Sequence, residues 1–165
     1  MFDVAIEYNH AMGKPEVVPI ATMQFKSAIP NDIEIVPVAY ITLDALRAMS
    51  GRESEFASLL VERLKAMMSY NKCGEMQEMQ LDCDWTKSTK KIYSSLCSSV
   101  KEILKKEGVK LSVTIRLHQL KETPPEADSG VLMLYNTGAL KDVATRNSIL
   151  DIKDVEPYLD RTDYS

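Results

Sequence analysis

Two aspartates inside an apolar run are the side chains of this sequence best suited to chemistry. Residues 79–86 read MQLDCDWT. Side chains alternate along a strand, so Asp82, Asp84 and Thr86 are expected to share one face and the apolar residues between them the other. Two carboxylates in a buried strand cost free energy unless they line a polar cavity or pair with cations. At about 6–7 Å apart they could divide acid and base roles between them.

A second polar face is expected from residue 110 to residue 119, where Thr114, Arg116 and His118 alternate with apolar residues. We expect Arg116 to pair with one of the two aspartates. The alternative is that this pair only holds two strands together. His118 is the candidate titrating group because its ordinary pKa lies near neutrality, and the alternative is a hydrogen-bonded structural histidine. The predicted catalytic residues are therefore Asp82, Asp84 and His118.

Neither a metal nor another cofactor is predicted. The spacing of Asp82, Asp84 and His118 lacks the regularity of a ligand motif such as His-Glu-x-x-His. The three cysteines also lack ligand spacing, and their odd number favours reduced thiols over a disulfide framework. Asp3 is a further candidate acid near the end of the first strand, although it could equally face solvent.

The elements that would position these residues alternate between strand and helix. The patterns predict strands near residues 1–6, 33–41, 77–85, 110–119 and 131–136, helices near 53–72 and 88–107, and a short hairpin around residues 13–15. Such alternation is typical of parallel strands. Polar faces on two successive strands favour a barrel over an open sheet covered on both sides. A TIM-type (β/α)8 barrel has eight strands, so we predict one domain over residues 1–165, an incomplete barrel lacking its first and last strands.

Composition excludes several classes of function. The chain has 165 residues, 45% of them hydrophobic and 27% charged, with a formal net charge of −4. That charge argues against nucleic acid as the partner, because phosphate binding favours a basic face. No apolar run approaches the ~20 residues that span a bilayer, so no membrane span is predicted. The open edges of an incomplete barrel make self-association possible.

Two short motifs resemble those of the chitinase-like glycoside hydrolases of family 18. Residues 81–85, LDCDW, are similar to the family's fourth-strand Asp-x-Asp-x-Glu signature, and residues 133–136, MLYN, to its sixth-strand Met-x-Tyr-Asp/Asn. The chain also resembles a group of Bacteroidetes lipoproteins with glycosidase-like barrels, over residues 80–86, 114–119 and 135–138. Because members of that group extend past both ends, Met1 is a candidate internal methionine, and the location implied is periplasmic or cell-surface.

The resemblance implies a carbohydrate partner and gives roles to individual residues. Asp84 matches the Asp that orients the substrate's N-acetyl group, Asp82 its supporting Asp, and Tyr135 the sugar-facing Tyr. The family's proton donor, a Glu, falls at Thr86, which cannot act as a general acid near neutral pH. The predicted substrate-binding residues are Asp3, Tyr40, Thr86, Arg116, Tyr135 and Asn136. Tyr40 and Tyr135 are the candidates for stacking on a sugar ring, whereas Trp85 is expected in the core.

Three interpretations remain open from the sequence. The first is a glycoside hydrolase-like protein with an altered acid/base set, acting on or binding a polysaccharide or oligosaccharide. The second is a non-catalytic carbohydrate-binding barrel or a truncated inactive fragment of a longer protein. The third is a small-molecule enzyme of another barrel family, which would need a phosphate-binding glycine loop that the sequence does not show.

Overall fold

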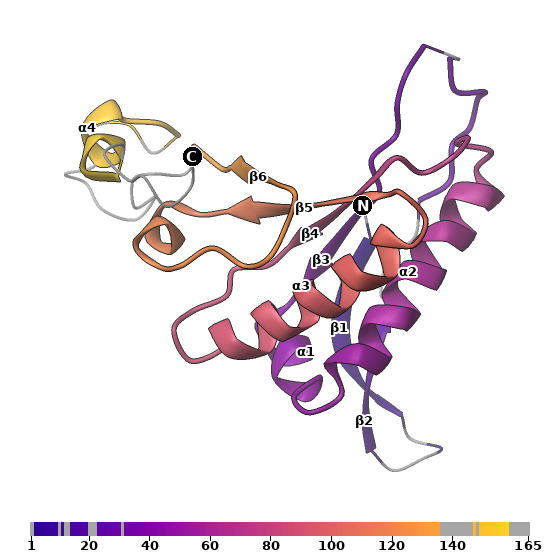
Figure 1. Cartoon of the computed structure of the whole chain (residues 1–165), viewed down its shortest axis with the longest axis horizontal. Helices are drawn as coiled ribbons and strands as arrows, with labels where there is room; N and C mark the ends of the chain where they lie inside the picture. The colour runs from indigo at the N-terminus through magenta and orange to yellow at the C-terminus, as the bar shows by residue number, and fades with distance from the viewer. Residues whose placement is uncertain are drawn as a thin grey trace.

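The structure is a computed structural model that describes residues 2–9, 11, 14–19, 23–30, 32–135, 147 and 149–158. Its centre is a six-stranded sheet in the order β2-β1-β3-β4-β5-β6 (Figure 1). The strands are β1 (Phe2–Asn9), β2 (Lys14–Pro19), β3 (Val38–Ile41), β4 (Glu78–Asp82), β5 (Lys110–Ile115) and β6 (Ser129–Leu132).

Five of these strands run parallel, and they lie side by side in the order of the chain. β1 pairs with β3, β3 with β4, β4 with β5 and β5 with β6, each in parallel. The predicted α/β class and parallel sheet are therefore confirmed. The described strands form an open sheet, however, and do not close into a barrel. The TIM-barrel part of the prediction is not confirmed.

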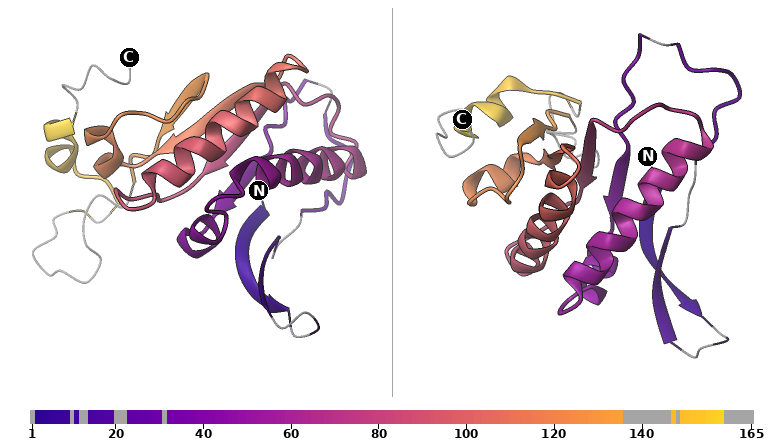
Figure 2. Two further views of the ribbon diagram at one scale, coloured as in Figure 1. Left: turned by 60° about the horizontal axis from the view of Figure 1, so that its bottom comes forward. Right: turned by 45° about the vertical axis from the view of Figure 1, so that its right-hand side comes forward.

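Three helices lie on the same side of the sheet (Figure 2). They are α1 (Leu43–Ala48), α2 (Glu53–Tyr70) and α3 (Lys90–Lys105). α2 and α3 match the two helices predicted from sequence. α1 was not predicted, although Thr42 caps it by accepting a hydrogen bond from the backbone N–H of Ala45 at 3.3 Å. After α3 the chain turns through Gly108, whose φ of 71° is easily adopted only without a Cβ.

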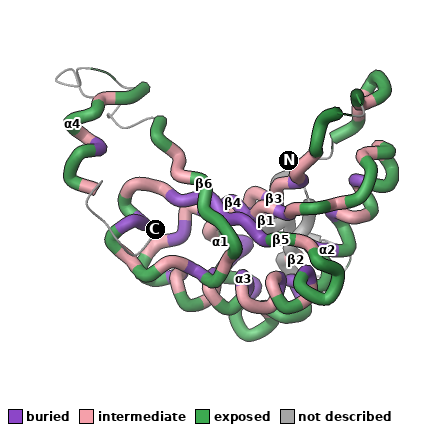
Figure 3. Tube along the Cα trace, turned by 45° about the horizontal axis from the view of Figure 1, so that its top comes forward, coloured by how far each residue is buried: buried purple, intermediate pink, exposed green. Residues whose placement is uncertain are grey.

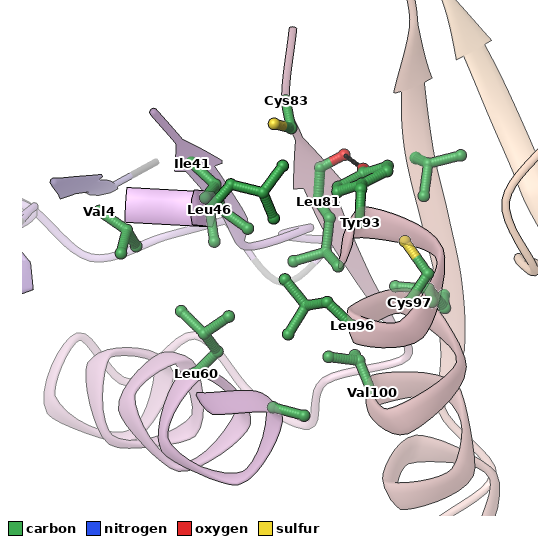
Figure 4. Packing of buried hydrophobic residues seen from close by; sticks show 14 of the residues in the cluster. Val4, Ile41, Leu46, Leu60, Leu81, Cys83, Tyr93, Leu96, Cys97 and Val100 are labelled. Carbon is green, nitrogen blue, oxygen red and sulfur yellow. Dashed lines mark hydrogen bonds between the residues drawn. The ribbon is translucent and has the colours of Figure 1, made fainter. Parts of the chain in front are cut away.

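The hydrophobic core fills the space between these helices and the sheet (Figure 4). Leu81 of β4 is fully buried there beside Tyr93 and Leu96 of α3. The Tyr93 hydroxyl donates a hydrogen bond to the Leu81 carbonyl at 3.3 Å. All three cysteines are free, as predicted, and burial raises the pKa of the Cys83 thiol to about 12, with the charge of Asp84 acting in the same direction. Cys83 therefore acts as a core residue and not as a nucleophile.

The two edges of the parallel sheet differ in whether another strand covers them. At one edge β2 pairs with β1 in an antiparallel hairpin, from Val4 opposite Pro19 to Asn9 opposite Lys14. This hairpin corresponds to the one predicted around residues 13–15. At the other edge β6 is mostly exposed (Figure 3). Ile115 of β5 approaches Gly130 of β6 closely, so a Cβ at residue 130 would force the end of the Ile115 side chain to shift.

Several predicted strands are shorter than the sequence pattern. The ladder of the 33–41 segment begins only at Val38, directly after Pro37, which cannot donate a ladder hydrogen bond. The 110–119 strand ends at Ile115 and is followed by a 3-10 helix, η1 (Leu117–Lys121). The last predicted strand is displaced to Ser129–Leu132. Two short elements, α4 (Ile152–Val155) and η2 (Glu156–Tyr158), follow, and no described helix is long and apolar enough to cross a membrane.

Candidate functional site

The face of the sheet opposite the helices is polar at its centre. Tyr40 of β3 lies in register with Asp82 of β4, and the β4–β5 pairing places Thr114 beside Asp82 in the same row. Asp82 is 7% exposed and Thr114 1% exposed, so this polar row is largely removed from water. Because parallel strands in register present the same face, the row follows directly from the alternation seen in the sequence.

Asp82, Asp84 and Arg116 form one charged cluster at the carboxyl ends of β4 and β5. Arg116 donates from Nε to Asp84 Oδ1 at 2.5 Å and from Nη2 to Asp82 Oδ1 at 3.1 Å. The Thr114 hydroxyl donates to the same Asp82 oxygen at 2.6 Å. The structure thus shows the predicted Asp–Arg pairing with both aspartates at once. The Asp82 side chain is 10% exposed and that of Asp84 is 49% exposed, so Asp84 is the carboxylate that reaches solvent.

The charges of this cluster also act on its neighbours. The pKa of Tyr40 is raised, first by partial burial and then by the negative charges of Asp84 and Asp82. For Arg116, burial alone would lower the pKa, but the hydrogen bond to Asp84 and the charges of both aspartates outweigh it and raise the pKa. One guanidinium nitrogen, Nη1, is buried and has no hydrogen-bond partner among the described residues.

Gln119, which sequence reasoning missed, holds the chain after β4 in place. Its side chain is fully buried, and its Nε2 donates to the carbonyls of Cys83 and Trp85, each at 3.1 Å. Its Oε1 accepts from the backbone N–H of Arg116 at 2.8 Å. Gln119 therefore ties the residues flanking Asp84 to the start of η1. Residue 119 lies within the 114–119 segment of resemblance, but its polar neighbours His118 and Lys121 leave it with no local signal of this role.

His118 is not on the strand where the alternation placed it, and that prediction is wrong. The residue lies on η1 and is exposed, because the backbone leaves the extended conformation after Arg116. Its Nε2 lies 3.3 Å from the Trp85 carbonyl oxygen, which can only accept, so this contact requires a proton on Nε2. His118 nevertheless borders the same cavity as Asp84.

Thr86 belongs to a turn of hydroxyl-bearing residues that leads into α3. Its Oγ1 lies 3.0 Å from the Ser88 hydroxyl, and its carbonyl accepts from the N–H groups of Thr89 and Lys90. The N-cap of α3 is Thr89, three residues further along. Position 86 therefore contributes a hydroxyl to the site and no acid.

A cavity of about 630 Å³ opens beside the charged cluster. It is lined by Asp84, Thr86, Arg116, Leu117, His118, Met133, Tyr135, Asp154 and Tyr158. Leu117 is the first residue of η1 and borders this cavity. Asp154 and Tyr158 come from α4 and η2, where the sequence had no motif to mark them. η2 lies beside η1, and Lys121 of η1 places its Nζ 4.7 Å from the centre of the Tyr158 ring.

The remaining predicted residues divide into those near the cavity and those outside it. Tyr135 lines the cavity and is 50% exposed, which suits a residue that stacks on a ligand. Trp85 is 2% exposed and packs on Tyr93, with ring centroids 6.2 Å apart, as expected for a core residue. Asp3 is paired with Tyr40 through the backbone register of β1 and β3. Asn136 lies outside the described residues.

The arrangement favours recognition by hydrogen bonds and ring contacts. Carboxylate, hydroxyl, guanidinium and phenol groups meet at one cavity, and together they can accept, donate and stack. Across the described part of the chain, no three His, Cys, Asp or Glu side chains converge well enough to hold a metal ion. Comparison with family models, with curated proteins and with solved structures found no match in any of the three. The resemblance to family 18 therefore stays a prediction.

Proposed function

We propose that this chain forms part of a glycosidase-like β/α barrel and binds carbohydrate in the cavity beside Asp84 and Arg116. The observation that carries the proposal is the cluster at the carboxyl ends of β4 and β5, where Arg116 bonds both aspartates next to a cavity that contains Tyr135. Active sites of β/α barrels lie at that end of the strands. Sugar hydroxyls both donate and accept, so they match the mixture of groups that lines this cavity.

The order of the strands supports the barrel part of the proposal. In an open doubly wound sheet, helices cover both faces and the strand order reverses at a switch point. Here β1, β3, β4, β5 and β6 follow one another without reversal, and α1, α2 and α3 lie on one side. The other side carries the polar row of Tyr40, Asp82 and Thr114. A sheet with helices on one face and polar residues on the other is what a β/α barrel requires, because its helices lie outside and the opposite face of its strands points to the interior.

Binding is favoured over hydrolysis because position 86, where the family's proton donor falls, carries a threonine. The Asp82 and Asp84 oxygens that face Arg116 act as hydrogen-bond acceptors, and Thr86 supplies only a hydroxyl. Loss of a general acid typically costs about 10²–10⁴ in rate. Hydrolysis remains the second candidate, since His118 borders the cavity together with Asp84 and an imidazole can transfer protons near neutral pH.

Isothermal titration calorimetry of the protein with a panel of oligosaccharides tests the proposal. Asp84→Asn should weaken binding by about tenfold to hundredfold, because it removes a charged acceptor worth about 1.5–3 kcal/mol. Asp44→Asn is the matched control, since Asp44 is exposed on α1, away from the cavity, and pairs with Arg47 one turn along the helix. An aryl glycoside assayed in parallel separates the two candidates. A hydrolysis rate that falls sharply in Asp84→Asn would establish that the protein is an enzyme. A binding affinity that is unchanged in Asp84→Asn would refute the proposed site.

A further inference from the structure

The cavity beside Asp84 carries more negative than positive charge. Two of its lining residues, Asp84 and Asp154, are acidic, and one, Arg116, is basic. Arg116 also donates a hydrogen bond to Asp82, which is largely buried. Arg116 is therefore shared by Asp82 and Asp84. The described charges at the cavity are three carboxylates, this guanidinium and the Lys121 ammonium on the Tyr158 ring, which leaves an excess of one negative charge.

Among the described residues, Asp154 contributes most to this excess. It takes part in none of the ion pairs between described residues. The ammonium of Lys121 lies over the ring of Tyr158. Asp154 is partly buried, and it lies on α4 at the border of the cavity. A carboxylate held in this way attracts a cation from solution.

The aromatic residues of the cavity point to the same kind of ligand. Tyr135 and Tyr158 both line it, and the faces of tyrosine rings attract cations. Tyr158 already shows this property, since Lys121 Nζ lies 4.7 Å from its ring centre. Carboxylates combined with tyrosine faces are suited to an organic ammonium group and disfavour a carboxylate or sulfate.

We propose that the carbohydrate bound here is a basic one, an amino sugar with a free ammonium group that lies between Asp84 and Asp154. This inference rests on the proposed function and adds the charge of the ligand to it. Neutral sugars would bind more weakly because they leave Asp154 without a partner, and acidic sugars would be repelled. Since the attraction is between partly exposed charges, it should weaken as salt rises.

The test compares three oligosaccharides of equal length by calorimetry at about pH 6, where a free sugar amine is protonated. They are a glucosamine oligomer, its N-acetylated form and an oligogalacturonate. The glucosamine oligomer should bind about fivefold or more tightly than the N-acetylated one, and the oligogalacturonate should not bind measurably. Asp154→Asn should remove most of this preference. Glu156→Gln is the matched control, because Glu156 is exposed two residues away and does not line the cavity.

The outcomes separate this inference from the proposed function. Equal or tighter binding of the neutral or acidic oligomer, with Asp84 still required, would overturn the charge preference and leave carbohydrate binding intact. A preference lost equally in Asp154→Asn and Glu156→Gln would reflect overall charge and would also overturn it. Absence of binding by all three oligomers would refute both. Thermal unfolding of the two variants, expected to match the parent chain, verifies that each is folded.

Discussion

The two faces of this sheet are made by the same strands but are held together by different forces. On the helix-covered face, Leu81 and its neighbours are buried among hydrocarbon side chains. On the opposite face, one residue along β4, Asp82 is buried to nearly the same extent but depends on Arg116 and Thr114. Burial alone therefore does not show how a residue contributes to stability.

This difference explains why the two faces tolerate change differently. Hydrophobic packing is not directional, so any apolar side chain of similar volume preserves much of it. The charged cluster is directional, and removal of one member leaves another buried without its partner. The helix-covered face should therefore respond mainly to volume, and the open face to charge.

The largest effect is expected from Arg116→Leu. It leaves Asp82, whose side chain is 10% exposed, without its cation, which should lower the free energy of unfolding by about 3–5 kcal/mol. Urea denaturation followed by circular dichroism measures the change. Arg47→Leu is the control, because the exposed pair of Arg47 with Asp44 should contribute less than about 1 kcal/mol.

A double variant sharpens the Arg116 comparison. Adding Asp82→Asn to Arg116→Leu removes the unpaired charge and should recover part of the lost stability. If the double variant is as unstable as the sum of the two single variants, Asp82 does not depend on the guanidinium, and the electrostatic description of the open face is wrong.

Adjacent residues of β4 provide the next comparison. Leu81→Ala creates a cavity on the helix-covered face and should cost about 2–5 kcal/mol. Gln80→Ala removes a half-buried hydrogen bond to the Ser112 hydroxyl on the open face and should cost about 1 kcal/mol. Urea denaturation of both variants ranks them. The reverse ranking would mean that the two faces have been assigned wrongly.

The smallest effect concerns Asp128, which joins β5 to the strand at the open edge. The backbone N–H of Leu111 donates to its carboxylate at 2.8 Å and lowers its pKa, and Lys101 at 3.2 Å acts in the same direction. A lowered pKa stabilises the fold above the ordinary carboxyl pKa of about 3.9, and this contribution is lost as the pH falls through the lowered value. Asp128→Asn should therefore lower stability by less than about 1 kcal/mol at neutral pH.

The pH dependence of that difference is the measurement. Unfolding of the parent chain and of Asp128→Asn should differ near neutrality and converge as the pH falls below the ordinary carboxyl range. A difference that stays constant from neutral to strongly acidic pH would show that the charge of Asp128 is not what stabilises the β5–β6 connection.

The sequence predicted those features that depend on local periodicity. The two long helices and the parallel strands follow from the spacing of apolar residues, and the Asp82–Asp84 face follows from alternation. His118 was misplaced because the alternation of side chains continued in the sequence beyond Ile115, where the backbone hydrogen bonds stop. Gln119, Asp154 and Tyr158 had no local signal, since their roles arise from contacts with residues far away in the chain.

The hydrogen bonds of Gln119 have a consequence for the order of folding. They join residues 34 and 36 positions apart, and the bond from Arg116 to Asp84 spans 32. Contacts of such separation close a large loop of chain. The conformational entropy of that loop is lost before the contacts can stabilise the fold. α3 lies within that loop and can form from local contacts. The site should therefore assemble after α3 has docked, as one of the last events of folding, and the amide hydrogens around residues 83–86 should exchange before those of the helix.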